Sequence, residues 1–128
     1  MDGDTVKVLV AGNQQWKIRL AEIDAPEKRQ PWGKRAKQAL AAKIFEKEVE
    51  VTVTGTDRYG RYIGKIRLGD RDINREMVRE GHAWVYRKYM NDRSLLDDEA
   101  EARKGRLGLW SLPEAQRTPP WEWRRTRR

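Results

Sequence analysis

Three short groups of charged residues have the types and spacing to do chemistry. They are DGDT at 2–5, the set of Arg19 with Asp24 and Glu27, and DRYGR at 57–61. Carboxylate oxygens are the ligands that calcium and magnesium prefer, and the planar fork of arginine matches two oxygens of a phosphate. Each group alone is more often an ordinary turn with solvated charges. It is therefore their combination that indicates a site where a metal ion and a phosphate meet.

Such a site has a clear chemical use, because a phosphodiester is anionic and repels an attacking hydroxide. A metal held by two aspartates would bind the ester and the attacking water. A nearby glutamate could accept a proton, and arginines could hold the charge that grows in the transition state. Pro26 lies between Asp24 and Glu27. We expect it to fix a turn that lets both carboxylates face one phosphate, with Arg19 reaching it from the same strand.

The rest of the composition excludes several other chemistries. The chain has no cysteine and a single histidine, His82. Disulfides, thiolate metal sites, a cysteine nucleophile and a multi-histidine zinc site are therefore excluded, and a Ser-His-Asp triad is disfavoured. His82 follows a predicted helix end and is expected to be structural. The residues that remain favour a hard metal that prefers oxygen ligands.

The charge balance indicates an anionic partner. Lysine and arginine number 28 against 20 acidic residues, a formal net charge of +8, and residues 117–128 alone hold five arginines and one glutamate. Nucleic acid is the first candidate, and an anionic membrane surface is the second. The chain has no run of about 18 apolar residues, so no membrane span is predicted. It also has no signal-peptide pattern. We expect nucleic acid as the partner, with no membrane and no obligate protein partner.

Hydrophobic periodicity predicts alternating strands and amphipathic helices. Predicted strands cover 5–10, 16–20, 49–54 and 62–68; predicted helices cover 31–48, 72–80 and 94–105; Gly12-Asn13 and Gly69-Asp70 are predicted turns. Asp72 is the expected N-cap of the second helix and Gly81 its end, and Ser94 with Asp97 forms a capping-box pattern for the third. Residues 1–112 read as one domain, and 113–128 as a flexible basic tail rich in Pro, Trp and Arg.

Five stretches together resemble the staphylococcal nuclease family. They are DGDT at 2–5, RLAEIDAPE at 19–27, DRYGR at 57–61, NREMVREGHAWVY at 74–86 and GLW at 108–110, in the order and spacing of that family. The resemblance implies an α+β fold, a five-stranded OB-fold barrel with three helices, and agrees with the order of predicted elements. The family has more strand ahead of DGDT, so the first strand is expected to be shortened. A periplasmic or secreted protein would be compatible with the resemblance.

The resemblance also implies calcium-dependent hydrolysis of DNA and RNA. Asp4 and Asp24 match the family's calcium carboxylates, and Ala25 falls where the family uses a backbone carbonyl as ligand. Glu27 matches the general base, or the residue that positions the attacking water.

The substrate contacts carry over in the same way. Arg19 and Arg61 match the two arginines that bind the reacting phosphate. Arg58 and Tyr59 match positions that contact the far phosphate of the nucleotide. Tyr89 falls on a tyrosine near the base, and the adjoining family tyrosine falls on Arg87 unless Tyr86 supplies it through a shift.

Other functions remain open at this stage. A catalytically inactive nucleic-acid-binding OB-fold module would have the same basic surface, but such a module would be expected to lose one of the five catalytic positions, and none is lost. A basic protein-interaction domain would explain the positive charge but not the combination of carboxylates and arginines in these motifs. The arginine-rich tail could bind nucleic acid or could only aid solubility.

Overall fold

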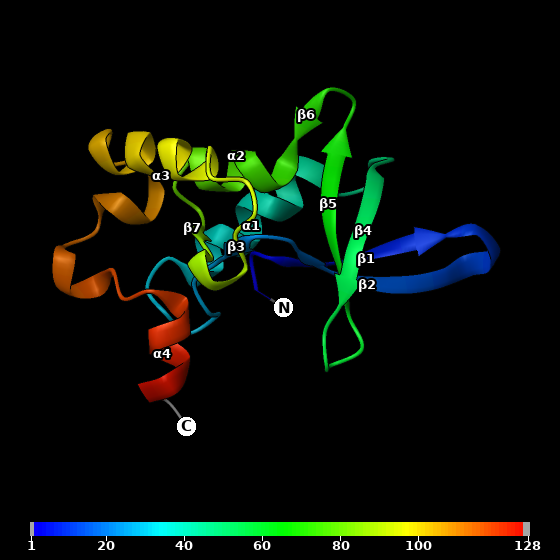
Figure 1. Cartoon of the computed structure of the whole chain (residues 1–128), viewed down its shortest axis with the longest axis horizontal. Helices are drawn as coiled ribbons and strands as arrows, with labels where there is room; N and C mark the ends of the chain where they lie inside the picture. The colour runs from blue at the N-terminus through cyan, green and yellow to red at the C-terminus, as the bar shows by residue number, and fades with distance from the viewer. Residues whose placement is uncertain (1, 127–128) are drawn as a thin grey trace.

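The computed structural model describes residues 2–126 and shows an α+β fold with a mixed sheet and four α-helices (Figure 1). The helices are α1 (Gly33–Ile44), α2 (Ile73–Arg79), α3 (Leu95–Lys104) and α4 (Pro120–Thr126). The strands are β1 (Thr5–Val10), β2 (Gln14–Leu20), β3 (Ile23–Asp24), β4 (Glu50–Thr56), β5 (Tyr62–Leu68), β6 (Arg71–Asp72) and β7 (Trp84–Val85). Short 3-10 helices span Ala11–Asn13, Arg87–Tyr89, Gly108–Ser111 and Glu114–Gln116.

The main sheet has five strands, which run in the order β1-β2-β5-β4 with β6 paired to β5. Strands β2 and β5 run parallel, and the other pairs are antiparallel. Strands β3 and β7 form a separate antiparallel pair. The main sheet brings the end of β2 beside β1 and β5, so the three predicted groups of charged residues meet at one end of these strands. Closure of the sheet into a barrel stays a prediction.

The predicted hairpin at the start of the chain is confirmed. Strand β1 pairs with β2 from Thr5 opposite Arg19 to Val10 opposite Gln14. Gly12 and Asn13 have positive φ angles of 80° and 61°, which a tight reversal requires and which these two residue types tolerate. The hairpin register places Asp4, just before β1, beside the end of β2.

Two helix ends differ from the sequence prediction. The predicted first helix covers 31–48, but α1 ends at Ile44, because the backbone of Phe45 leaves the helical region. The capping-box prediction for Ser94 is also wrong. The Ser94 hydroxyl donates to Asp92 and accepts from Arg75 instead of capping α3.

Other helix predictions are confirmed. The Asp72 side chain accepts a hydrogen bond from the backbone N–H of Arg75 at 3.0 Å and so caps α2. Gly81, with a φ of 80°, follows the end of that helix, as expected for a glycine stop. None of the described helices is long and apolar enough to cross a membrane.

The interior has two apolar clusters. The larger lies between the main sheet and helices α1 and α2, and includes Ile18, Leu40 and Ile66. The smaller contains Trp84 and Trp110, and Trp121 of α4 packs against it.

The segment 113–128 carries secondary structure within its described part. It contains the 3-10 turn Glu114–Gln116 and helix α4, which the sequence did not predict. The expected three helices are therefore four among the described residues. The predicted division into residues 1–112 and a flexible tail stays a prediction.

Asn74 ties the loop after β2 to strand β5. Its side-chain oxygen accepts from the N–H of Ile66 at 3.0 Å, and its amide nitrogen donates to the carbonyls of Ala21 and Gly64, each at 3.1 Å. The residue is 5% exposed, so water cannot readily replace these partners. Asn74 thereby fixes the segment that leads from Arg19 to Asp24.

We expect Asn74→Ala to lower the free energy of unfolding by about 3 kcal/mol, because it leaves buried backbone groups without partners. Urea unfolding of the parent and the variant would measure this difference. Asn91→Ala is a matched control, since the side chain of Asn91 is exposed. A loss no larger for Asn74→Ala than for Asn91→Ala would contradict the role given to Asn74.

Candidate active site

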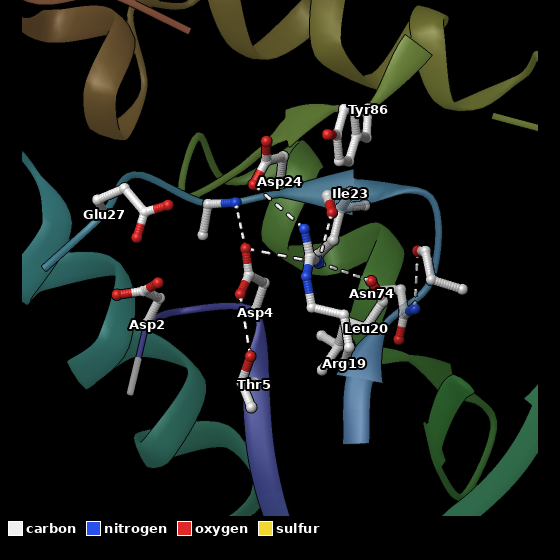
Figure 2. Close-up of polar contacts among 12 residues, drawn as sticks. Asp2, Asp4, Thr5, Arg19, Leu20, Ile23, Asp24, Glu27, Asn74 and Tyr86 are labelled. Atoms are coloured by element: carbon white, nitrogen blue, oxygen red, sulfur yellow. Dashed lines mark hydrogen bonds and ion pairs between the residues drawn. The ribbon is translucent and has the colours of Figure 1, made fainter. Parts of the chain in front are cut away.

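Arg19 organises the turn between β2 and β3. Its Nη1 donates to the carbonyls of Leu20 at 3.0 Å and Ile23 at 2.8 Å, and its Nη2 donates to Oδ1 of Asp24 at 3.2 Å (Figure 2). Nη1 also lies 3.5 Å from Oδ2 of Asp4. The guanidinium therefore lies between the two aspartates, and its side chain is only 13% exposed.

Asp4 is held by its neighbours from both sides. Its Oδ2 accepts the backbone N–H of Ala25 at 2.8 Å, and its Oδ1 accepts the hydroxyl of Thr5 at 3.2 Å. The carbonyl of Asp4 accepts the N–H of Leu20 at 2.7 Å. These bonds fix the Asp4 carboxylate against the segment that carries Asp24.

Glu27 is positioned by Gln30 and by the close approach of Gly33, the first residue of α1. Its N–H donates to the Gln30 side chain at 3.0 Å, and its carbonyl accepts the N–H of Gln30 at 2.9 Å. A Cβ on Gly33 would lie 1.9 Å from the carbonyl oxygen of Glu27, so only glycine allows this approach. The fully buried Pro26 lies between Asp24 and Glu27.

The site concentrates negative charge away from water. Asp24 is fully buried, and this burial, with the nearby Asp4 carboxylate, raises its pKa to about 6 although Arg124 and Arg19 oppose the shift. Burial raises the pKa of Asp2 to about 6, and a hydrogen bond to Glu27 and the negative charge of Glu27 add to this shift. Crowded carboxylates of this kind are relieved by a cation.

The oxygen donors at the site are of the type that binds a divalent cation. Asp4 and Asp24 offer hard oxygens and belong to neighbouring segments, which suits calcium. Within residues 2–126, no group of three or more acidic or histidine side chains has metal-binding geometry. The residues present therefore fit the calcium prediction in type, and carbonyl and water oxygens would have to complete the coordination.

Arg61 reaches this site through Thr5. Its Nη1 donates to the Thr5 hydroxyl at 3.3 Å, and Thr5 in turn donates to Asp4. Its Nε donates to Asp57 at 2.7 Å. Burial opposes ionisation of Asp57, but hydrogen bonds from Arg61 and Tyr59 outweigh it and lower the pKa of Asp57. Asp57 thus orients the Arg61 guanidinium at the edge of the site.

The predicted nucleotide contacts fall into two groups. Arg58 and Tyr59 lie in the exposed turn between β4 and β5, where the Arg58 guanidinium donates to the Tyr59 hydroxyl at 3.0 Å. Their described contacts are with each other, Asp57 and Arg61, and none reaches the aspartates. Tyr86 and Tyr89 pack edge to face, with ring centroids 4.9 Å apart.

Of these two tyrosines, Tyr86 lies closer to the arginine of the site. Its ring centroid is 6.0 Å from Cζ of Arg19. Among the predicted residues, Arg19 contacts Asp4 and Asp24, and Asp4 contacts Ala25.

One residue at the site was not predicted. Arg124 of α4 forms ion pairs with Asp24 at 2.8 Å and Glu27 at 2.7 Å. Burial opposes its ionisation, but hydrogen bonds to both carboxylates outweigh it and raise the pKa of Arg124. In the sequence, Trp121 and Arg124 are three residues apart, and this spacing places both side chains on one face of a helix. Nothing in that spacing says where the helix docks.

His82 lies outside this group. Its Nδ1 accepts the indole N–H of Trp32 at 3.1 Å, and burial lowers its pKa. This contact suits the structural role predicted for it.

Comparisons with known proteins identify relatives that are similar to nearly the whole chain. Residues 17–112 match the family model described as Staphylococcal nuclease homologue. The chain is 47% identical to the micrococcal nuclease of Shigella flexneri, across 98% of this chain and 76% of that protein. It is 46% identical to Protein ParB of Escherichia coli, across 98% and 75%. It is also 40% identical to an uncharacterized endonuclease of Haemophilus influenzae, across 97% and 68%. The range matched by the family model includes Arg19, Asp24, Glu27 and Arg61.

Proposed function

Because the chain belongs to the staphylococcal nuclease family and is a nuclease by homology, we propose that it hydrolyses phosphodiester bonds of DNA and RNA with little sequence specificity and requires calcium. The observation that carries this proposal is the buried pair of Asp4 and Asp24, with Arg19 between them and Glu27 beside them. No residue of the predicted catalytic set is missing.

The proposed metal ligands are the carboxylates of Asp4 and Asp24 and the backbone carbonyl of Ala25. Bound calcium would supply a Lewis acid that neutralises the phosphate and acidifies water. The hydrogen bond from the Ala25 N–H to Asp4 supports this assignment, because it keeps the two ligand segments together.

The protein's own groups are proposed to orient the reactants and move the proton. Glu27 is the proposed acceptor of the proton from the attacking water, and Gln30, in the loop before α1, holds its backbone. Arg19 and Arg61 are proposed to hold phosphate oxygens and stabilise the charge that develops on them. Their hydrogen bonds to protein acceptors orient both guanidiniums before substrate arrives.

The remaining proposed substrate contacts lie on both sides of the site. Arg58 and Tyr59, at the β4–β5 turn, are proposed to contact the far phosphate. Tyr86 and Tyr89 are proposed to contact a base, since an aromatic face can stack on any base without selecting its sequence. We further propose that the five-stranded sheet is that of an OB-type barrel with a shortened first strand, and that residues 1–112 form the nuclease domain.

Digestion of labelled single-stranded DNA and RNA tests the proposal. We expect both to be degraded in calcium, irrespective of sequence, and to survive in excess chelator, with activity restored when calcium is added back. Two unrelated sequences of equal length serve as the control for specificity. Full activity in chelator would contradict the metal requirement. Binding without cleavage under all conditions would instead favour the inactive nucleic-acid-binding module.

A further inference from the structure

Helix α4 places an arginine on the proposed catalytic carboxylates. Arg124 Nη1 donates to Oδ1 of Asp24 at 3.0 Å and to Oε1 of Glu27 at 2.7 Å, while Nη2 donates to Oδ2 of Asp24 at 2.8 Å. Both oxygens of Asp24 are thereby engaged by one guanidinium. Such bidentate, charge-assisted pairs are the strong form of this interaction.

The same helix places an indole on the proposed base-binding tyrosine. The rings of Trp121 and Tyr86 lie 5.4 Å apart at an interplanar angle of 5°, and the Trp121 ring meets Trp84 edge-on at 5.7 Å. Trp121 and Arg124 are three residues apart and share one face of α4. This one face therefore contacts both the carboxylates and the aromatic surface.

The segment before α4 is also attached near the site. The Gln30 side chain donates a hydrogen bond to the carbonyl of Thr118. Gln30 is the residue that positions Glu27. Figure 1 shows α4 beside the loop that leads from β3 to α1.

We propose that the active site is a docking surface for the chain's own helix α4, which must leave before calcium and a nucleotide can bind. This inference rests on the proposed function. Both oxygens of Asp24 accept hydrogen bonds from Arg124, so a cation that approaches Asp24 would compete with this guanidinium and be repelled by its positive charge. A base cannot stack on the face of Tyr86 that Trp121 covers. The helix thus presents a positive charge in place of the metal and a flat ring in place of a base.

The proposed docking is reversible, because the helix is short and its ion pairs are partly open to solvent. Helix α4 has seven residues, fewer than an isolated helix needs for stability. The Arg124 side chain stays 37% exposed, so its ion pairs are partly screened by solvent. Residues 117–128 hold five arginines, which a nucleic acid could attract with its phosphates. A polyanionic substrate would in this way draw the helix off the site that it then enters.

The expected effect on calcium binding follows from the docked fraction. The apparent dissociation constant equals the intrinsic constant divided by the fraction of molecules with an open site. If α4 is docked in about 90–99% of molecules, calcium binds about 10- to 100-fold more weakly than it would to the open site.

Calorimetric titration of the whole chain with calcium alone tests this. Arg124→Ala is expected to bind calcium at least about tenfold more tightly than the parent. Arg125→Ala is the matched control, because Arg125 is exposed on the same helix and its loss removes the same formal charge. The control is expected to bind as the parent does. Equal affinities for the two variants would overturn the inference.

Trp121→Ala supplies an independent test, since it removes the packing of α4 on Tyr86 and Trp84 without changing the net charge. It is expected to tighten calcium binding in the same direction, and calcium is expected to speed hydrogen exchange of the backbone amides of residues 121–126 in the parent. Unchanged affinity and unchanged exchange would overturn the docking model. Thermal melts of each variant establish that it is folded.

These outcomes separate this inference from the proposed function. If all variants bind calcium equally and the nuclease activity is present, only the docking model is contradicted. If no protein binds calcium, both the docking model and the proposed function are contradicted.

Discussion

Glu27→Gln is expected to slow hydrolysis of single-stranded DNA by about a hundred- to ten-thousand-fold, the usual contribution of a general base. Glutamine keeps the shape of the side chain but removes its negative charge and its ability to take a proton. The backbone bonds between Glu27 and Gln30, which position the residue, do not involve the altered atoms. The fold should therefore survive, and single-turnover rates at saturating calcium would measure the loss directly.

The matched control is Glu101→Gln, the same change on the exposed surface of α3. It is expected to leave the rate unaltered. Weaker docking of α4 cannot explain a loss in Glu27→Gln, because losing the pair of Glu27 with Arg124 would open the site. If Glu27→Gln cleaves at the parental rate, Glu27 has no place in the mechanism.

Arg61→Lys is expected to cost about 3 kcal/mol of transition-state stabilisation, or about a hundredfold or more in rate, although the charge is kept. An ammonium cannot present two parallel donors to two phosphate oxygens. Arg61 is held by Asp57 through its Nε, and its Nη1 is directed toward Thr5. Turnover at saturating calcium, with a thermal melt of the same sample, would measure the effect.

The Arg19→Lys variant is expected to hydrolyse DNA at least as slowly as Arg61→Lys, for two separate reasons. Its guanidinium also ties together the carbonyls of Leu20 and Ile23, so lysine would loosen the turn as well as the phosphate contact. Arg61→Lys is the cleaner test for this reason. Arg67→Lys, at an exposed position of strand β5, which begins just after Arg61, is the control and should be neutral. Near-parental rates in both Arg19→Lys and Arg61→Lys would leave these arginines as ordinary surface charges.

Much of the fold was predictable because its signals are local. Alternation through Val6 and Val8, with Gly12-Asn13 between the strands, predicts a hairpin whose register then follows from the turn. Asp72 and Gly81 mark the ends of α2 by their own side-chain and backbone chemistry. The carboxylates of the site were predictable because Asp4, Asp24 and Glu27 lie in motifs of fixed spacing.

The failures involve contacts that no local pattern encodes. Ser94 had the residue type of an N-cap, but Asp92 and Arg75 compete for its hydroxyl. Arg124 contacts Asp24 across 100 positions in the chain, so the composition of the tail showed its charge and not its destination. Helix α4 is stabilised by packing on the aromatic surface of the body rather than by its own short sequence.

The central claim is that the buried aspartates form the metal-dependent centre of hydrolysis, and Asp24→Asn tests it most directly. Asparagine is nearly isosteric with aspartate and keeps an oxygen acceptor for Arg19 and Arg124, but it removes the charge. Cleavage of single-stranded DNA would be followed across a calcium titration for the parent, Asp24→Asn and Asp97→Asn, an exposed control on α3. We predict that Asp97→Asn follows the parent, while Asp24→Asn loses cleavage at every calcium concentration that saturates the parent. A parental rate and calcium response in a folded Asp24→Asn protein would contradict the assignment of this site.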